Sequence, residues 1–129
     1  MQNVALIQSM YQAFGQGDIA TILANCTDDI EWSLHATVNA PYIGTVRGKE
    51  AVQKWFGQLA ASDDITVFEP REFFGGTDHV TVLGFQKARV LPKGGEFESP
   101  WVHVFNIKGG KVSRWVGMYD SAARVKAGG

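Results

Sequence analysis

The hydrophobic pattern changes its period once along the chain, at Asp63-Asp64, and this change constrains the fold more than any other feature. Before it, apolar residues recur at the spacing of amphipathic helices, and after it they alternate with polar residues as on strands. Short turns rich in glycine and proline join the strand-like segments and favour hairpins. Helices followed by an antiparallel meander predict an α+β domain whose sheet buries one face under the helices.

The predicted elements divide at the same point. One helix is expected over 4–14, a second begins after the N-cap residue Asp18 and includes Cys26, and a third surrounds Trp55. Pro70 indicates an edge strand or a bulge. The tail, about 122–129, is expected to be frayed. A loop is expected over 36–45, and the predicted strands cover 30–34, 65–74, 80–91, 97–107 and 111–119.

A sheet of long strands curls, and helices across its concave face leave a tapering cavity. The chain of 129 residues therefore predicts one cone-shaped domain, 1–129, with about three helices from its first half on the concave face. The large apolar residues Phe105, Trp115 and Tyr119 are expected to include residues on opposite faces of the last hairpin. We expect a homodimer through the outer sheet face to cover the second of these faces.

Charge and composition exclude several classes of protein. The sequence contains twelve Lys and Arg and thirteen Asp and Glu, and the basic residues do not cluster. Nucleic-acid binding is therefore not expected. There is no apolar run of bilayer length and no secretory pattern, and we expect a cytoplasmic, soluble protein without membrane contact. Cys26 is the single cysteine and the three histidines share no ligand spacing, so neither a disulfide nor a metal site is expected. Nucleotide-binding glycine motifs are also absent, and no cofactor is predicted.

The segment 101–105 concentrates the residues suited to a ligand cavity. Alternation places Trp101, His103 and Phe105 on one face of a strand and the two valines between them on the other. An imidazole among such rings is desolvated, which favours its neutral form, and neutral histidine is a competent general base or hydrogen-bond donor. His103 is thus a candidate catalytic residue, and the alternative is a core histidine bonded to a carbonyl.

Asp120 follows the last strand and is the second catalytic candidate. If the alternation of that strand stays regular, Asp120 shares a face with Met118 and lies where the sheet adjoins the mouth of the cavity. Its carboxylate would orient His103 or act as the base itself. The alternative is that Asp120 caps a short C-terminal helix, since aspartate is a favoured N-cap, and both roles are compatible.

Further apolar side chains are expected to shape the cavity. Trp32 is predicted to face the interior from the short strand, whereas His35 at its end is expected to be exposed. Tyr42 lies in the following loop and is a candidate lid. The predicted substrate-binding residues are Trp32, Tyr42, Phe56, Trp101 and Met118.

Several short segments, taken in order, resemble one known family. They are Phe14 to Asp18, Asp29 to Trp32, Pro41 to Gly48, Trp101 to Phe105, Gly110 to Val112 and Tyr119-Asp120. In this order and spacing the chain resembles the SnoaL-like branch of the superfamily of ketosteroid isomerase and nuclear transport factor two. The resemblance covers nearly the whole chain. It implies the cone-shaped fold and a dimer, both in agreement with the pattern above.

The resemblance implies less about the reaction, because one fold hosts many activities. It places the base of ketosteroid isomerase at Trp32, its oxyanion aspartate at Val102 and its oxyanion tyrosine near Met10, so true steroid isomerisation is not expected. The acid/base aspartate of the polyketide cyclases corresponds to Asp120. Arg114 and Asp120 alone do not rebuild the constellation of the limonene epoxide hydrolases.

Three functions therefore remain open. The first is an enzyme like the isomerases, cyclases or hydrolases that transfers a proton on a small hydrophobic carbonyl compound. The second is a module that binds a small apolar ligand without converting it. The third is a structural or dimerisation domain whose pocket is filled by its own side chains.

Overall fold

The computed structural model describes residues 2–36 and 40–129. None of the helices in these residues is long and apolar enough to span a bilayer. The elements, in chain order, are α1 (Gln2–Gly15), α2 (Ile19–Ala24), β1 (Cys26–His35), β2 (Gly44–Arg47), α3 (Lys49–Ser62), β3 (Asp63–Gly75), β4 (His79–Val90), β5 (Glu96–Lys108), β6 (Lys111–Tyr119) and α4 (Ser121–Lys126).

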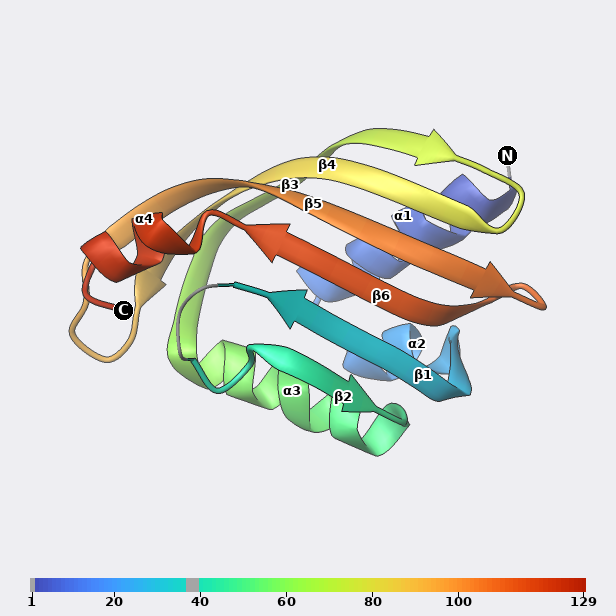
Figure 1. Ribbon diagram of the computed structural model, residues 1–129, viewed down its shortest axis with the longest axis horizontal. Coiled ribbons are helices and arrows are strands. Elements are labelled where there is room, and N and C mark those ends of the chain that lie inside the picture. Colours follow the sequence, from blue (N-terminus) through green and yellow to red (C-terminus); the bar gives the residue numbers. More distant parts are fainter. Residues whose placement is uncertain (1, 37–39) are drawn as a thin grey trace.

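The six strands form one curved sheet in the order β2-β1-β6-β5-β4-β3, with α1, α2 and α3 on the same side of it (Figure 1). Four of the five pairs of neighbouring strands are antiparallel, but β1 and β6 run parallel. The α+β fold class is thus confirmed, and the sheet that was predicted to be antiparallel contains one parallel pair. The parallel pair brings the first strand beside the last one.

The predicted helices form for the expected reasons. In α1 the spacing of Ile7, Met10 and Ala13 gives one buried stripe. Asp18 accepts a hydrogen bond from the backbone N–H of Thr21 at 3.1 Å and caps α2, as predicted. These stripes pack on the sheet and form, with its inner face, one hydrophobic core.

The first half of the sheet is larger than its sequence indicates. β1 begins at Cys26, four residues before the predicted start, and α2 ends at Ala24. The predicted loop 36–45 contains the start of β2, while positions 37–39 lie outside the described residues. Pro70 lies on the edge strand β3 at a register shift, which confirms the prediction of an edge or a bulge.

The C-terminal stretch was predicted to be frayed, but it is folded. It forms α4, whose N-cap Asp120 accepts from the backbone N–H of Ala123. The guanidinium of Arg124 donates two hydrogen bonds to Asp63 at the start of β3, at 3.0 and 2.8 Å. This buried ion pair ties the end of the chain to its middle.

The last hairpin places its large aromatic residues on one face, not on two. Phe105 and Trp115 lie opposite each other in the register, and each is only 3% exposed. The pairing shifts between Asn106 and Ile107, so both Val112 and Trp115 turn inward and the alternation of β6 is interrupted. The argument that these residues cover opposite faces was therefore wrong.

Candidate functional site

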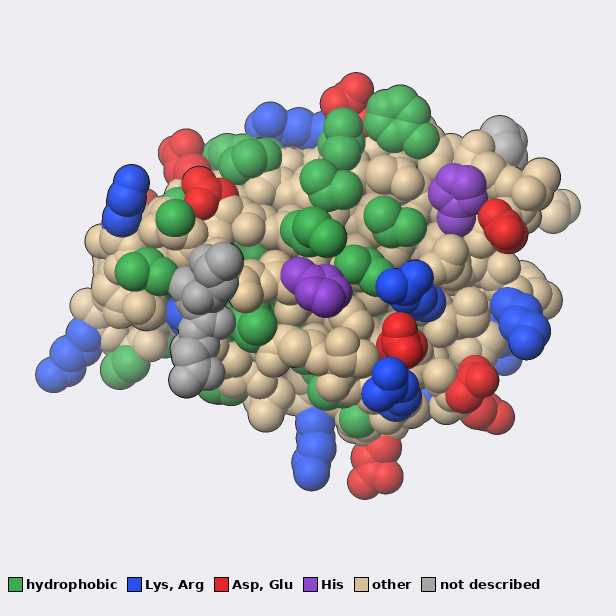
Figure 2. All heavy atoms as spheres, viewed as in Figure 1, with side chains coloured by type: hydrophobic (Ala, Val, Ile, Leu, Met, Phe, Trp, Pro, Cys, Tyr) green, Lys and Arg blue, Asp and Glu red, His purple; other side chains and the backbone are tan. Residues whose placement is uncertain are grey.

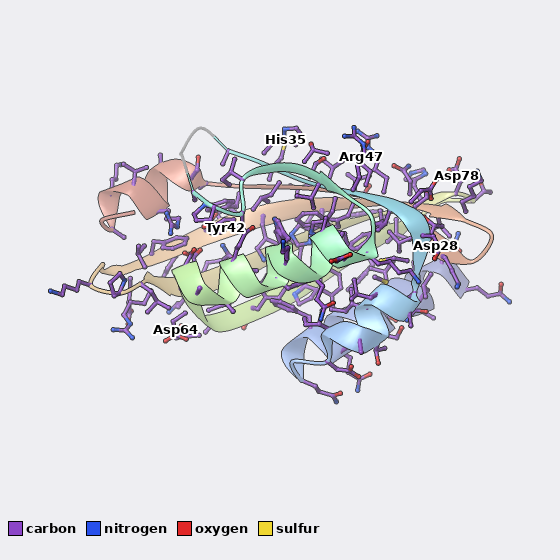
Figure 3. All side chains as sticks on the ribbon, turned by 90° about the horizontal axis from the view of Figure 1, so that it is seen from below. Asp28, His35, Tyr42, Arg47, Asp64 and Asp78 are labelled. Carbon is purple, nitrogen blue, oxygen red and sulfur yellow. The ribbon has the colours of Figure 1, made fainter. Side chains whose placement is uncertain are left out.

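A cavity lies between the concave face of the sheet and the helices, and most of its wall is aromatic. Figure 3 shows side chains from α3 and the sheet filling the space between them, with Tyr42 at one end. The residues that line the cavity are Met10, Tyr11, Phe14, Ile22, Trp32, Leu34, Tyr42, Trp55, Phe56, Leu59, Asp63, Ile65, Phe68, Gln86, Trp101, His103, Phe105, Trp115, Met118 and Tyr119.

The open space inside is small, about 90 Å³. Pockets for drug-sized ligands span about 300–1,000 Å³, and an engineered protein cavity of about 150 Å³ accepts benzene. The cavity therefore suits a molecule smaller than benzene. An open groove beside α3 shares Phe14, Phe56, Leu59, Asp63 and Ile65 with the cavity wall, so these residues separate the cavity from solvent.

Tyr11 and His103 form a polar pair inside this apolar wall. The hydroxyl oxygen of Tyr11 lies 2.6 Å from Nδ1 of His103, a hydrogen bond whose direction depends on the histidine tautomer. The two rings lie almost parallel, and the imidazole also stacks on Trp101 with ring centres 4.0 Å apart. The pair joins α1 to the middle of β5 and fixes the orientation of the imidazole.

Burial keeps both members of this pair uncharged. Desolvation lowers the pKa of His103 to about 3 and raises the pKa of Tyr11 well above its usual value. At neutral pH the cavity therefore holds a neutral imidazole and a neutral phenol. Such a pair can move a proton between its members without creating a net charge.

A second polar group lies at the end of the cavity near α4. The Tyr42 hydroxyl donates to Oδ2 of Asp63 at 2.7 Å and lies 3.2 Å from the Tyr119 hydroxyl, while Oδ1 of Asp63 accepts from Arg124. Burial raises the pKa of both tyrosines. The carboxylate thus has donors on both oxygens and a paired charge.

Two glycines make room for the aromatic wall. Gly84 lies opposite Trp101 in the register, and a Cβ at this position would overlap the indole ring. A Cβ at Gly117 would overlap the ring of Trp115, two residues earlier on the same strand, at 2.5 Å. In a strand interior a glycine often marks such a close approach, here of an indole ring.

The structure gathers most of the predicted site residues around the cavity. Trp32, Tyr42, Phe56, Trp101 and His103 all line it and are buried. Tyr42, the candidate lid, is 1% exposed and forms part of the wall through Asp63.

The two predicted residues at the end of β6 lie differently. Met118 borders the cavity, but it is 54% exposed and lies opposite Val102, which is 40% exposed, so its side chain faces mainly outward. Asp120 does not belong to the cavity wall, and its carboxylate caps α4. Of the two roles weighed for Asp120, the cap is the one with a contact in the structure.

Sequence reasoning missed Tyr11 as the partner of His103. The expected partner was the carboxylate of Asp120, but a phenol from α1 takes that place. The available signal was a tyrosine next to Met10, at a position that continues the helical spacing of the apolar residues in the first helix. Within residues 2–36 and 40–129, no group of three or more His, Cys, Asp or Glu side chains is arranged to hold a metal ion.

The sequence matches a known family model over most of its length. The model of the SnoaL-like domain matches residues 7–115. The chain belongs to the SnoaL-like family. A comparison with curated proteins finds no match.

Solved structures agree with this SnoaL-like assignment. An NTF2-like protein from Burkholderia xenovorans is 30% identical, with a TM-score of 0.87 over 98% of this chain and 95% of that one. A candidate SnoaL-like polyketide cyclase from Mesorhizobium loti is 15% identical, with a TM-score of 0.73 over 88% and 95% of the two chains. A protein with the ketosteroid isomerase-like fold from Catenulispora acidiphila, in complex with trimethylamine, is 15% identical, with a TM-score of 0.79 over 95% and 92%. The last two likenesses concern the fold alone.

Proposed function

We propose that this SnoaL-like protein binds a small, uncharged carbonyl compound in its cavity and transfers a proton on it. The observation that carries the proposal is the hydrogen bond of 2.6 Å between Tyr11 and His103 inside an aromatic wall. Proton transfer by a positioned histidine or tyrosine is a common source of rate acceleration. Ketosteroid isomerase, which has a related fold, also uses a general base beside hydrogen-bond donors to a carbonyl oxygen.

The proposed step begins with Nδ1 of His103 protonated and donating to the Tyr11 oxygen. Nε2 takes a proton from the carbon next to the ligand carbonyl, and the electron pair of that C–H bond forms a C=C bond. The Tyr11 hydroxyl gives its proton to the carbonyl oxygen and receives the Nδ1 proton of His103. An enol forms, and both residues are neutral before and after the step. This route suits a site in which burial disfavours charge on either ring.

Exchange of the ligand's α-protons tests the proposal without knowledge of the natural product. With cyclobutanone in D₂O, proton NMR should show that the protein accelerates loss of the α-proton signal. Tyr11→Phe should slow the protein-dependent exchange by about 10²-fold, since general acid–base groups contribute about 10²–10⁴-fold. His79→Gln, which changes an exposed histidine, serves as the control.

Two results would contradict the relay. Saturable binding of cyclobutanone with no accelerated exchange would support the non-catalytic binding module instead. A large loss of exchange in Asp120→Asn, with Tyr11→Phe unaffected, would assign the base to Asp120.

We also propose that the protein is a homodimer through the outer face of the sheet. Apolar residues occupy neighbouring positions of β4, β5 and β6, namely Leu83, Val102, Val104, Val116 and Met118, and of these only Met118 also borders the cavity. In Figure 2 hydrophobic side chains gather over the middle of this face. An exposed apolar group of this kind is typical of an interface between copies of a chain.

A charge in the middle of this face should abolish the dimer. Val102→Glu is expected to shift the mass in sedimentation equilibrium from two chains to one, because a glutamate would be buried at the interface without a partner. Val125→Glu changes a similarly exposed valine on α4, 49% exposed, and should leave the mass unchanged. A wild-type protein that sediments as a single chain at high concentration would contradict the proposal.

A further inference from the structure

Two indole N–H groups in the cavity wall have no hydrogen-bond partner. Nε1 of Trp32 and Nε1 of Trp101 are buried, and the residues are 4% and 3% exposed. Within the described part of the chain the only other buried side-chain N or O atom without a partner is Oγ1 of Thr27, which does not line the cavity. A buried donor left unpaired has lost its hydrogen bond to water without a replacement, which is unfavourable. Two of them in one small cavity need an explanation.

Another indole N–H in the same wall has a hydrogen-bond partner within the protein. Nε1 of Trp55 donates to the backbone carbonyl of Tyr42 at 2.6 Å. Of the acceptors in the wall, Nδ1 of His103 is already bonded to Tyr11, and both oxygens of Asp63 already have donors. No acceptor of the protein is bonded to the indole N–H of Trp32 or Trp101, and a molecule inside the cavity that carries an acceptor would satisfy them.

The charges around the cavity limit which ligands could supply acceptors to the two indole N–H groups. Asp63 is the acidic residue in the wall, and Arg124 offsets its charge. An ammonium ion would use the faces of the aromatic rings, but it would offer no acceptor to either indole N–H. A hydrocarbon would leave both donors unpaired. An uncharged oxygen meets the donors without bringing a charge into the cavity.

We propose that Trp32 and Trp101 determine ligand specificity by donating their indole N–H groups to oxygen acceptors of a small uncharged compound, a ketone or aldehyde rather than a hydrocarbon or an ammonium ion. This inference rests on the proposed use of the cavity and names the chemical class that it selects. It assigns the two tryptophans to binding, separate from proton transfer by the Tyr11–His103 pair.

The test compares ligands of one shape that differ in the acceptor. Cyclobutanone has a carbonyl oxygen, and methylenecyclobutane has a CH₂ group in its place. Each is titrated into protein labelled with ¹⁵N at the indole nitrogens, with tetramethylammonium as a third probe. Cyclobutanone should bind more tightly than methylenecyclobutane and shift the indole N–H signals of Trp32 and Trp101 downfield. The signal of Trp55, whose N–H is already bonded, should move least.

Phenylalanine variants separate the contribution of the indole N–H to binding from that of the aromatic ring. Trp32→Phe and Trp101→Phe should each reduce the preference for cyclobutanone over methylenecyclobutane by about three- to tenfold, the effect of one hydrogen bond. Trp55→Phe is the matched control, because it removes an indole whose N–H faces the protein. It should change the affinity for both probes alike and leave their ratio unchanged. The ratio of affinities remains informative even if a variant alters the size of the cavity.

Each other outcome has a definite meaning. Equal affinity for the ketone and the alkene, or tighter binding of tetramethylammonium, overturns the inference but leaves the cavity as a ligand site. If none of the three probes binds, the result contradicts both the proposed function and the inference. Ketone-selective binding without α-proton exchange supports the inference and contradicts only the proton transfer.

Discussion

Replacing Arg124 by Met is expected to lower the free energy of unfolding by about 3–5 kcal/mol, the typical cost of removing one partner of a buried ion pair. Arg124 and Asp63 have side chains that are only 6% and 3% exposed, and two N–H groups of the guanidinium donate to one carboxylate oxygen. In the variant Asp63 would keep the Tyr42 hydroxyl as its donor but would carry an unpaired buried charge. Urea denaturation followed by circular dichroism measures the loss.

Two further variants separate charge from packing. Lys126→Met changes an exposed cation in the same helix and should alter stability by no more than about 0.5 kcal/mol. The double variant Asp63→Asn with Arg124→Met removes the unpaired buried charge and should recover part of the lost free energy of unfolding. An Arg124→Met protein as stable as the wild type would show that the ion pair does not hold α4.

The second large effect is a loss of stability in acid that originates at His103. Burial lowers the pKa of this histidine from 6.5 to about 3. At a pH between these two values, His103 is therefore protonated in the unfolded chain and neutral in the folded chain. Stability from this group therefore decreases as the pH falls below 6.5, by about 1.4 kcal/mol per pH unit. Across the whole window the loss is roughly 5 kcal/mol. Above pH 6.5 the group has no such effect.

The contribution of His103 is measured as a difference between proteins. The pH dependence of unfolding in the wild type includes every carboxylate, but these contributions cancel on comparison with His103→Gln. We expect the wild type to lose stability more steeply between pH 6.5 and pH 4 than this variant. His35→Gln, at the exposed end of β1 (Figure 3), should follow the wild-type curve. Parallel curves for the wild type and His103→Gln would contradict a neutral buried imidazole.

The parts of the site that the sequence predicted depend on local geometry. Within one strand, alternation alone determines that Trp101, His103 and Phe105 face the same side, and the structure has them so. The same reasoning did not hold across the last hairpin, because a register shift at Asn106 changed which residues of β6 turn inward. A single-residue shift of this kind leaves no mark in the hydrophobic pattern.

The missed parts depend on contacts between distant segments. The Tyr11–His103 bond joins residues 92 positions apart, and the Arg124–Asp63 bond joins residues 61 positions apart. The sequence shows that Tyr11 belongs to a buried stripe, but the position at which α1 crosses the sheet decides what its hydroxyl meets. Arg124 in a short polar tail is typical of a solvated residue, and only the docking of α4 explains its burial.

The parallel pairing of β1 with β6 has a consequence for biosynthesis. Trp32 stacks on Trp115 across this pair, with ring centres 4.5 Å apart, so one wall of the cavity needs a strand from each end of the chain. While the polypeptide emerges from the ribosome, β1 lacks this neighbour until residues 111–119 have been translated. Contacts of such long sequence separation slow folding. The edge of β1 that pairs with β6 therefore stays unpaired until then, a period in which chaperones have access to it.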